Sequence, residues 1–452
     1  MQSSFNPATL LLIGTALVLA FIGAKVMKRF GIPQILGFML AGLFLGVTGI
    51  LDPGTRTSLF PLVDLALGLI GYNIGLELRK DVFSGQTRRM SIILISESIL
   101  TFGLVTMLAY FVIRQLHIAI VFGALASATD PASTVMVIWE RKCKGNLTDT
   151  LMFVLAMDDV IAILLANISI SIAVLYYSTP GSITLMGALL TSAYEIFASS
   201  IAGGVSGAAM AYFINRESDR RELLELELGV IILLVGLMSY LHLSSILACM
   251  VFGFIVGNYV SSEKDPVSHT LNIVMTPIVM IFFVIVGASI DLSVIMQVSV
   301  LMLALLYVGG RTFAKYFGAY GGAKITDTPP LTSRYLGLCL MSQAGVAVGL
   351  SLVVELNLIS IGTADAVFYG TLILNVIVLT TMILQVFGPI AASEGLRRAG
   401  EYPRSDYGPE GEVLFGLPLR LESCDDDANP ENHSEYPPDS TNDNEESSGL
   451  SG

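Results

Sequence analysis

The chain alternates between long apolar segments and short polar ones, and this pattern predicts a polytopic, all-α membrane protein. A helix that crosses a bilayer needs about 20 mostly apolar residues, and counting apolar runs by this rule predicts about 13 transmembrane helices. The predicted ranges are 9–28, 34–51, 60–78, 91–113, 117–139, 148–177, 185–214, 223–240, 243–260, 270–290, 295–319, 332–356 and 361–388.

Composition supports this class and divides the chain in two. Hydrophobic residues make up 54% and charged residues 13%, and the mean hydropathy is +0.73. Residues 399–452 hold 14 acidic residues against two basic ones, so nearly all of the net charge of −13 lies there. We therefore expect a transmembrane domain over 1–398 and an acidic, disordered tail over 399–452. No basic surface indicates a nucleic-acid partner, and the isolated cysteines form no zinc or disulfide pattern.

Basic residues predict the orientation. Sixteen lysine and arginine residues fall in loops that follow odd-numbered helices, whereas only Arg56 and Arg114 follow even-numbered ones. Basic loops stay in the cytoplasm, so we expect a cell-membrane protein with an outside N-terminus and a cytoplasmic tail. The helices can be divided into six, one linker helix (185–214) and six more. Because the linker crosses the membrane once, the two halves would run in opposite senses, which is the inverted-repeat plan of many secondary transporters.

Seven ionisable side chains fall well inside predicted spans. Each costs at least about 2.5–3.5 kcal/mol there, which makes each a functional candidate. They are Glu97, Asp130, Asp158, Asp159, Glu195, Arg311 and Lys315.

The segment "SATDPAST" (127–134) predicts a broken helix inside the membrane. Pro131 has no N–H and restrains Asp130 away from helical angles. Backbone groups freed in this way must line a cavity or meet a partner, so we expect a polar site, with Thr129 and Asp130 capping the second half-helix. The alternative is a merely kinked helix in which the Asp130 carboxylate caps locally.

The segment "LCLMSQAGVAVGLSL" (338–352) is the natural counterpart in the second half. Ser342, Gln343 and Gly345 interrupt it at a similar depth, and both segments are the fifth helix of their six. Two broken helices would then cross near the midplane, although small residues in membrane helices more often serve close packing.

Asp158 and Asp159 are consecutive, so on a helix their side chains point about 100° apart. Two carboxylates this close repel each other, which lets one of them exchange a proton for a hard cation. Oxygen ligands suit a small monovalent ion such as Na+. The alternative is a buried pair that is held neutral for structural reasons.

Arg311 and Lys315 stand four residues apart on one helical face, and buried cations need partners. One cation could hold a structural carboxylate, for which we expect a Glu97–Arg311 pair, while the other pairs with a transport carboxylate. Lysine is the better switch because arginine stays charged. Alternatively, Lys315 extends to the cytoplasmic edge of the membrane.

The chain resembles the monovalent cation:proton antiporters, in particular the second cation:proton antiporter family with its Kef-type and NapA-type members. The resemblance covers nearly the whole membrane part, and Thr-Asp-Pro with a downstream Asp-Asp is its most specific feature. The matching segments are "IPQILGFMLAGLFLG" (32–46), "NIGLEL" (73–78), "ATDP" (128–131), "MDDV" (157–160), "RTFAKYFGAYGGAK" (311–324) and "RYLGLCLMSQAGVAVGL" (334–350).

This resemblance implies the NhaA/NapA-like fold, with inverted six-helix repeats, two crossed broken helices, a dimer domain and elevator-like alternating access. It also implies that Asp159 is the main ion and proton carboxylate and that Asp158 pairs with a membrane-embedded base. Thr129 and Asp130 match the crossing-helix residues near the site.

The base that the resemblance implies is Lys315, because "KYFG" has the Lys-x-x-Gly form, with Arg311 as the other candidate. Glu97, Ser342 and Gln343 would support the site. An Asp-Asp pair with lysine implies electrogenic exchange, which the nearby Arg311 leaves open.

We therefore predict a secondary antiporter, not an enzyme, that exchanges Na+, or else Li+ or K+, for protons at Asp159 and serves pH homeostasis. A K+-selective antiporter is the first alternative, and a cation channel or organic-anion transporter fits less well. No nucleotide or other cofactor is expected. We expect a homodimer, with Gly42–Gly46 and Gly203–Gly207 available for close packing either between subunits or within one.

Overall fold

The computed structural model describes residues 7–30, 32–51, 59–78, 87–178, 185–216, 220–259, 266–343, 345–402, 413–414 and 417–418. The chain divides into two compact units, Met1–Tyr407 and Gly408–Gly452. This division lies beyond the expected 398/399 boundary, because the residues just after 398 pack with the membrane unit. In the second unit, β1 (Val413–Leu414) pairs antiparallel with β2 (Leu417–Pro418). The predicted disorder of the tail otherwise falls outside the described residues.

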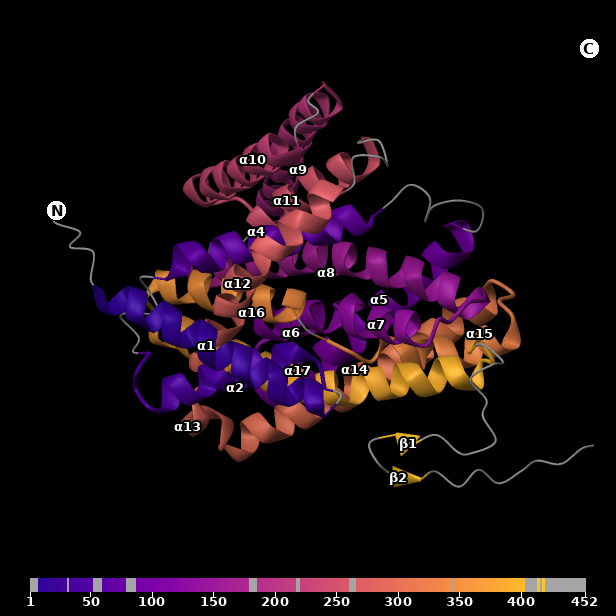
Figure 1. Ribbon diagram of the computed structural model, residues 1–452. Helices are drawn as coiled ribbons and strands as arrows, with labels where there is room; N and C mark the ends of the chain where they lie inside the picture. The colour runs from indigo at the N-terminus through magenta and orange to yellow at the C-terminus, as the bar shows by residue number, and fades with distance from the viewer. Residues whose placement is uncertain are drawn as a thin grey trace, which may run out of the picture. The chain divides into compact units, whose positions relative to one another are not determined.

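The membrane unit is built from helices (Figure 1). Their bounds are α1 (Pro7–Arg29), α2 (Gln34–Val47), α4 (Phe60–Glu77), α5 (Thr87–Ile113), α6 (Leu116–Ser127), α7 (Pro131–Glu140), α8 (Asn146–Ser178), α9 (Leu185–Arg216), α10 (Arg220–Tyr240), α11 (Ser245–Tyr259), α12 (Pro266–Ala288), α13 (Leu292–Ile295), α14 (Val298–Ile325), α15 (Pro330–Tyr335), the 3₁₀ helix η3 (Leu336–Leu340), α16 (Gly345–Ile361) and α17 (Ala364–Arg398).

Many of these helices are long and apolar enough to cross a membrane. Within the described residues, eight helices meet that test, or nine if the bent pair Pro330–Leu340 and Gly345–Ile361 forms one span. Four shorter apolar helices, Gln34–Val47, Phe60–Leu76, Ser245–Tyr259 and Met275–Ala288, overlap further predicted spans. The prediction of an all-helical polytopic membrane protein is confirmed, while the total of about 13 spans stays a prediction.

The helices form two groups that pack mainly within themselves. One group contains α1, α2, α4 and α9 to α12, and the other contains α5 to α8 and α14 to α17. Figure 1 shows α9, α10 and α11 gathered together at one side of the unit. Close backbone approaches between the groups are few and run chiefly through α8 with α9, with fewer through α4 with α8 and α16, while side chains of both groups share one apolar core. The second group carries both predicted helix breaks.

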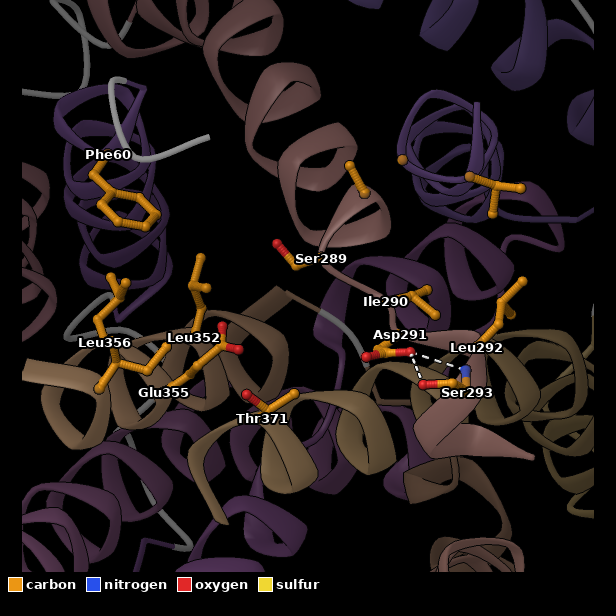
Figure 2. A pocket seen from close by; sticks show the side chains of 14 residues that line it. Phe60, Ser289, Ile290, Asp291, Leu292, Ser293, Leu352, Glu355, Leu356 and Thr371 are labelled. Atoms are coloured by element: carbon orange, nitrogen blue, oxygen red, sulfur yellow. Dashed lines mark hydrogen bonds between the residues drawn. The ribbon is translucent and has the colours of Figure 1, made fainter. Parts of the chain in front are cut away.

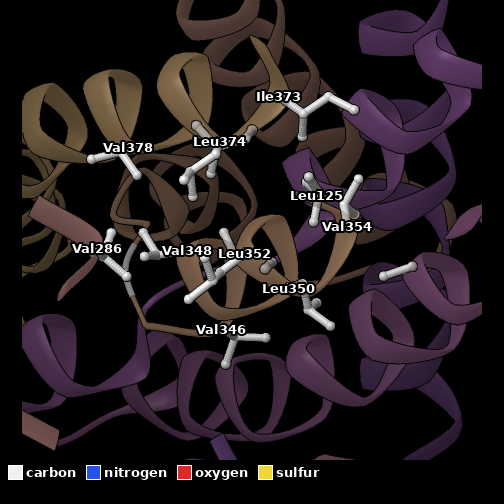
Figure 3. Close-up of a cluster of buried hydrophobic side chains, with 14 of the residues drawn as sticks. Leu125, Val286, Val346, Val348, Leu350, Leu352, Val354, Ile373, Leu374 and Val378 are labelled. Carbon is white, nitrogen blue, oxygen red and sulfur yellow. The ribbon is translucent and has the colours of Figure 1, made fainter. Parts of the chain in front are cut away.

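Burial is inverted relative to a water-soluble protein. Large apolar side chains such as Phe21, Phe197 and Leu233 are exposed, whereas Arg311 and Lys315 are fully buried. This is the distribution that a bilayer imposes, since charged groups must face the protein interior. The apolar interior between α6, α12, α16 and α17 is filled by branched side chains (Figure 3).

Glycines allow close helix approach at many points in the described residues, and three of these places bear on the predicted contacts. An added Cβ at Gly46 would lie 2.6 Å from the Ala288 carbonyl oxygen. Gly203 approaches the α11 backbone in the same way, so the two glycine runs are used within the chain. In the third place, α14 packs against α5, where a Cβ at Gly318 would lie 2.6 Å from Glu97 Cα and one at Gly322 would lie 2.8 Å from Ile93 Cα.

We predict that Gly318→Ala destabilises the protein by about 1–3 kcal/mol, because the added methyl group forces α14 away from α5. The matched control is Gly321→Ala in the same helix, since no described atom outside the helix's own turns lies within 4 Å of a Cβ at that position. Thermal unfolding in detergent measures both variants. Equal melting temperatures for the two alanine variants would contradict the packing argument.

Candidate functional site

The first helix break lies where Pro131 predicts it. α6 ends at Ser127, and Ala128 turns to extended angles of φ −61° and ψ 135°. α7 then begins at Pro131, so Thr129 and Asp130 lie between two half-helices. The carbonyl groups at the end of α6 therefore lack the N–H partners that a continuous helix would supply.

The second break lies in the predicted counterpart. η3 ends at Leu340 and α16 begins at Gly345, which leaves Ser342 and Gln343 outside regular helix. The two parts are bent by 44°. Both interruptions predicted from the sequence are thus present.

The two breaks touch each other. The Asp130 N–H donates to the Ser342 carbonyl at 3.2 Å, and the Ser342 hydroxyl donates to the Asp130 carbonyl at 3.0 Å. Thr134 Oγ1 lies 3.2 Å from Ser342 Oγ. Each break therefore satisfies part of the backbone of the other, which confirms that the two broken helices meet.

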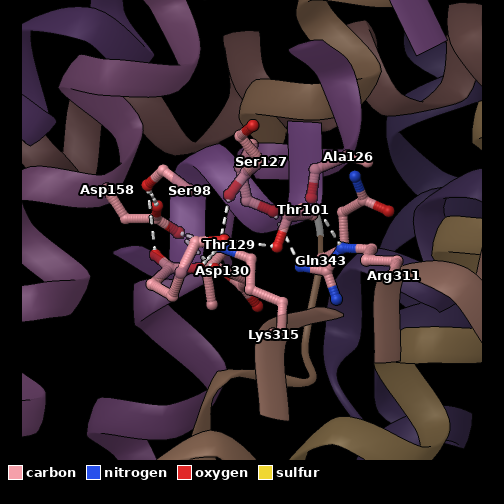
Figure 4. A network of polar contacts seen from close by, with 12 residues as sticks. Ser98, Thr101, Ala126, Ser127, Thr129, Asp130, Asp158, Arg311, Lys315 and Gln343 are labelled. Carbon is pink, nitrogen blue, oxygen red and sulfur yellow. Dashed lines mark hydrogen bonds and ion pairs between the residues drawn. The ribbon is translucent and has the colours of Figure 1, made fainter. Parts of the chain in front are cut away.

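Arg311 donates to backbone carbonyl groups of both breaks (Figure 4). This side chain is fully buried and donates to four backbone oxygens, two from each break. The distances are 3.1 Å to Ala126, 2.8 Å to Ala128, 2.7 Å to Met341 and 3.0 Å to Ser342. The planar fork of the guanidinium suits this task, since it offers five N–H donors in fixed directions.

Gln343 reinforces the same junction. Its Nε2 donates to the Leu125 carbonyl at 2.8 Å and to the Tyr307 hydroxyl at 2.9 Å. The sequence analysis identified Gln343 but missed Tyr307. A tyrosine within an apolar helix does not by itself indicate that its hydroxyl group meets a polar site.

Lys315 forms the charged centre of the site. Its Nζ lies 2.7 Å from Asp158 Oδ2 and 2.8 Å from Glu97 Oε2, and all three side chains are fully buried. Nζ also donates to the Ser127 carbonyl at 2.5 Å. Lys315, and not Arg311, is therefore the partner of Asp158, and the idea that Lys315 reaches the membrane edge is wrong.

The expected Glu97–Arg311 pair is also wrong. Gly318 lets the α14 backbone pack directly against Glu97. Lys315 lies only three residues before Gly318, so its side chain is at the height of the Glu97 carboxylate along the helix. Arg311 sits one turn further along α14 and reaches the breaks instead.

Thr129 and Asp130 have separate partners. The Thr129 hydroxyl donates to Asp158 Oδ2, as does the Ser98 hydroxyl to Oδ1 at 3.3 Å. The Asp130 carboxylate accepts from the N–H groups of Ala132 at 3.2 Å and Ser133 at 3.4 Å, so Asp130 caps α7 as expected and Thr129 does not.

Asp159 is buried, with 1% of its surface exposed. It follows Asp158 on α8, so its side chain leaves the helix about 100° away from the one that meets Lys315. Glu195, the remaining candidate, lies on α9 and accepts from Ser171 Oγ at 3.5 Å, away from this cluster. Sequence reasoning missed Glu227, which is 1% exposed and accepts from the Tyr72 hydroxyl, although it falls inside the predicted span 223–240.

A cavity of about 580 Å³ lies between the two helix groups. Asp64 and Glu195 line it from one group, and Asn167 and Ser171 of α8 line it from the other. Among the described lining residues the titratable side chains are two carboxylates and His242, with no lysine or arginine.

A second cavity, of about 470 Å³, lies beside α13 and α16 and contains Asp291 and Glu355 (Figure 2). Hydrogen bonds from Ser293 at 2.6 and 2.9 Å lower the pKa of Asp291. Asp291 lies outside the spans, and its carboxylate caps the short helix α13.

Comparisons with known proteins agree with this architecture. A family model described as "Sodium/hydrogen exchanger, transmembrane" matches residues 15–392. The chain is 23% identical over 345 residues to the probable Na(+)/H(+) antiporter 2 of Methanocaldococcus jannaschii, with 70% of this chain and 77% of that protein covered. It is 25% identical over 376 residues to a Na(+)/H(+) antiporter of Enterococcus hirae, with 81% and 94% covered.

The solved structure of the sodium proton antiporter MjNhaP1 from M. jannaschii at pH 8 has the same fold. The TM-score is 0.72 at 18% sequence identity, and the match covers 86% of this chain and 98% of that one.

We predict that Arg311→Met destabilises the protein by about 3–5 kcal/mol, since it leaves several buried carbonyl groups without donors. Arg311→Lys should rescue little, because an ammonium group has three donors and no planar fork. Lys324→Met, an exposed lysine in the same helix, is the control. Thermal unfolding and size-exclusion profiles measure the effect, and a stable Arg311→Met variant would show that the breaks hold without it.

Proposed function

The chain belongs to the sodium/hydrogen exchanger family, and on that premise we propose that it is a secondary active antiporter. It exchanges a monovalent cation, Na+ ahead of Li+ or K+, for H+. The family transports ions and is not enzymatic. The observation that carries the proposal is the buried Glu97–Lys315–Asp158 cluster next to Asp159 at the junction of two broken helices.

In this proposal, Asp159 is the carboxylate at which cation and proton compete. A bound proton removes the negative charge that attracts Na+, and a bound cation keeps the proton off the carboxylate. The carboxylate therefore holds either a proton or a cation, but not both. Carboxylate and carbonyl oxygens are the ligands that hard cations prefer, and Asp158 supplies the second carboxylate. Only occupied forms cross, which couples the two gradients without a nucleotide or other cofactor.

Lys315 gives this exchange a buried cationic partner. Because its Nζ contacts both Asp158 and Glu97, Asp158 can turn to a cation while Lys315 keeps Glu97. A lysine with a single carboxylate partner would be left buried and unpaired at that step, at a cost of several kcal/mol. Thr129 supports Asp158 in the same role, through its hydroxyl group.

The cavity between the helix groups supports a cation as substrate. Its carboxylates, Asp64 and Glu195, attract cations and repel anions, which disfavours an organic-anion transporter. We propose that cations reach the site through this space and that the second helix group moves against the first, since few close backbone approaches join the two groups.

The finer architecture is also a proposal. Packing of α2 on α12 corresponds to packing of α11 on α4, and α6–α8 corresponds to α16–α17. These pairings support inverted six-helix repeats around the linker α9, about 13 spans in all. We further propose membership of the second cation:proton antiporter family, an outside N-terminus in the cell membrane and a homodimer. Any dimer contact would lie away from Gly42–Gly46 and Gly203–Gly207.

We predict that purified protein in liposomes dissipates an imposed pH gradient when Na+ is added, saturably and in preference to Li+ or K+. Asp159→Asn should abolish this exchange, because an amide cannot bind and release a proton. Asp149→Asn, an exposed carboxylate on the same helix, is the matched control and should keep wild-type exchange.

Fluorescence of an entrapped pH indicator measures the exchange. Dissipation by K+ alone would redirect the proposal to a K+-selective antiporter. Cation flux that neither saturates nor needs protons would favour a channel and refute the proposal.

A further inference from the structure

α8, the helix that carries Asp158 and Asp159, begins without a cap of its own. It starts at Asn146 after Gly145, which has no side chain to accept the first N–H groups. Those groups need acceptors. Glu401, which follows α17 in the sequence, supplies these acceptors. Its carboxylate accepts from the Leu147 N–H at 2.6 Å and from the Thr148 N–H at 2.7 Å.

Two further contacts fix this arrangement. The Thr148 hydroxyl donates to Glu401 Oε2 at 2.7 Å, and the Lys144 N–H donates to the Glu401 carbonyl at 3.2 Å. A Cβ at Gly145 would lie 2.5 Å from Glu401 Cδ and 2.8 Å from Cγ. The missing side chain at Gly145 therefore leaves the space that the carboxylate fills.

Glu401 is itself held to α17. Its N–H donates to the Leu396 carbonyl at 3.3 Å. The next residue, Tyr402, is buried, and its hydroxyl lies 2.8 Å from Ser393 Oγ. The Arg141 guanidinium lies 5.9 Å from the centre of the Tyr402 ring. The cap is thus a rigid link between the end of α17 and the start of α8.

We infer that Glu401 is a positioning residue for the ion site. A carboxylate at a helix N-terminus also interacts favourably with the helix dipole, so the link sets the axial position of α8 relative to α17. α8 continues without a proline or a break to Asp158, about 18 Å further along at about 1.5 Å per residue. α17 also packs against α14, the helix that carries Lys315, so the link sets the level at which Asp158 meets Lys315. This inference rests on the proposed function.

The test uses full-length Glu401→Ala, Glu401→Gln and Gly145→Val, with Glu394→Gln as the control. Glu394 carries ion pairs to Arg397 and Arg398 on α17, so its loss removes a nearby charge without touching α8. Gly145→Val keeps Glu401 but displaces it and also strains the backbone at φ +154°, so its effect should be at least as large as that of Glu401→Ala. Glu401→Gln keeps one oxygen acceptor and should fall between wild type and Glu401→Ala.

Three measurements are made on each variant. Hydrogen–deuterium exchange of the peptide covering residues 146–150 should become faster in Glu401→Ala. The rate at which a hydrophobic carbodiimide labels the α8 carboxylates should change, and this readout needs no transport. In exchange assays, the KM for Na+ should change by up to about fivefold, the factor that corresponds to the free energy of one helix cap, with a shifted pH profile and a smaller change in kcat.

Unchanged hydrogen exchange at 146–150 would show that Glu401 does not hold α8. Faster exchange there with unchanged labelling, KM and pH profile would show a purely structural cap; either result overturns the inference. If the wild type exchanges no cation for protons, the proposed function fails. A carbodiimide effect confined to the Glu401 and Gly145 variants would then still support positioning of the α8 carboxylates.

Discussion

The structure depends on how backbone carbonyl groups are satisfied where two helices break inside a membrane. The hydrocarbon core of a bilayer offers no water to such groups, and each one left unpaired costs several kcal/mol. Arg311 supplies donors to both breaks at once, and Lys315 supplies one more to the first break. Both cations come from α14, so the close approach of this helix at Gly318 is what allows the polar junction to form.

The two buried cations divide their tasks according to their chemistry. Arginine keeps its charge and has a planar fork, and Arg311 donates to backbone oxygens, which do not titrate. Lysine is a compact point charge with rotatable donors, and Lys315 pairs with two carboxylates that compete for it. A structural cation and a responsive one can therefore stand one turn apart without sharing partners.

The sequence predicts the helix breaks well, because the effect of Pro131 on the chain is local and obligatory. It also identifies the buried charges, because their cost inside a membrane singles them out. It does not predict that Glu97 meets Lys315 instead of Arg311, since both cations share one helical face and only helix packing sets their level. Glu401 escapes prediction because the partners of its carboxylate lie more than two hundred residues away in the sequence, and its own position at the start of an acidic tail gives no sign of them.

The fixed spacing of Arg311, Lys315 and Gly318 limits how this chain can change its length. One residue gained or lost among them would turn the rest of α14 by about 100°, and the two cations and the glycine could no longer all face their partners. Insertions and deletions in related chains should therefore gather in the loops between helices. If a related sequence aligns with this chain only by means of a gap between Arg311 and Gly322, that protein is expected to lack this polar junction.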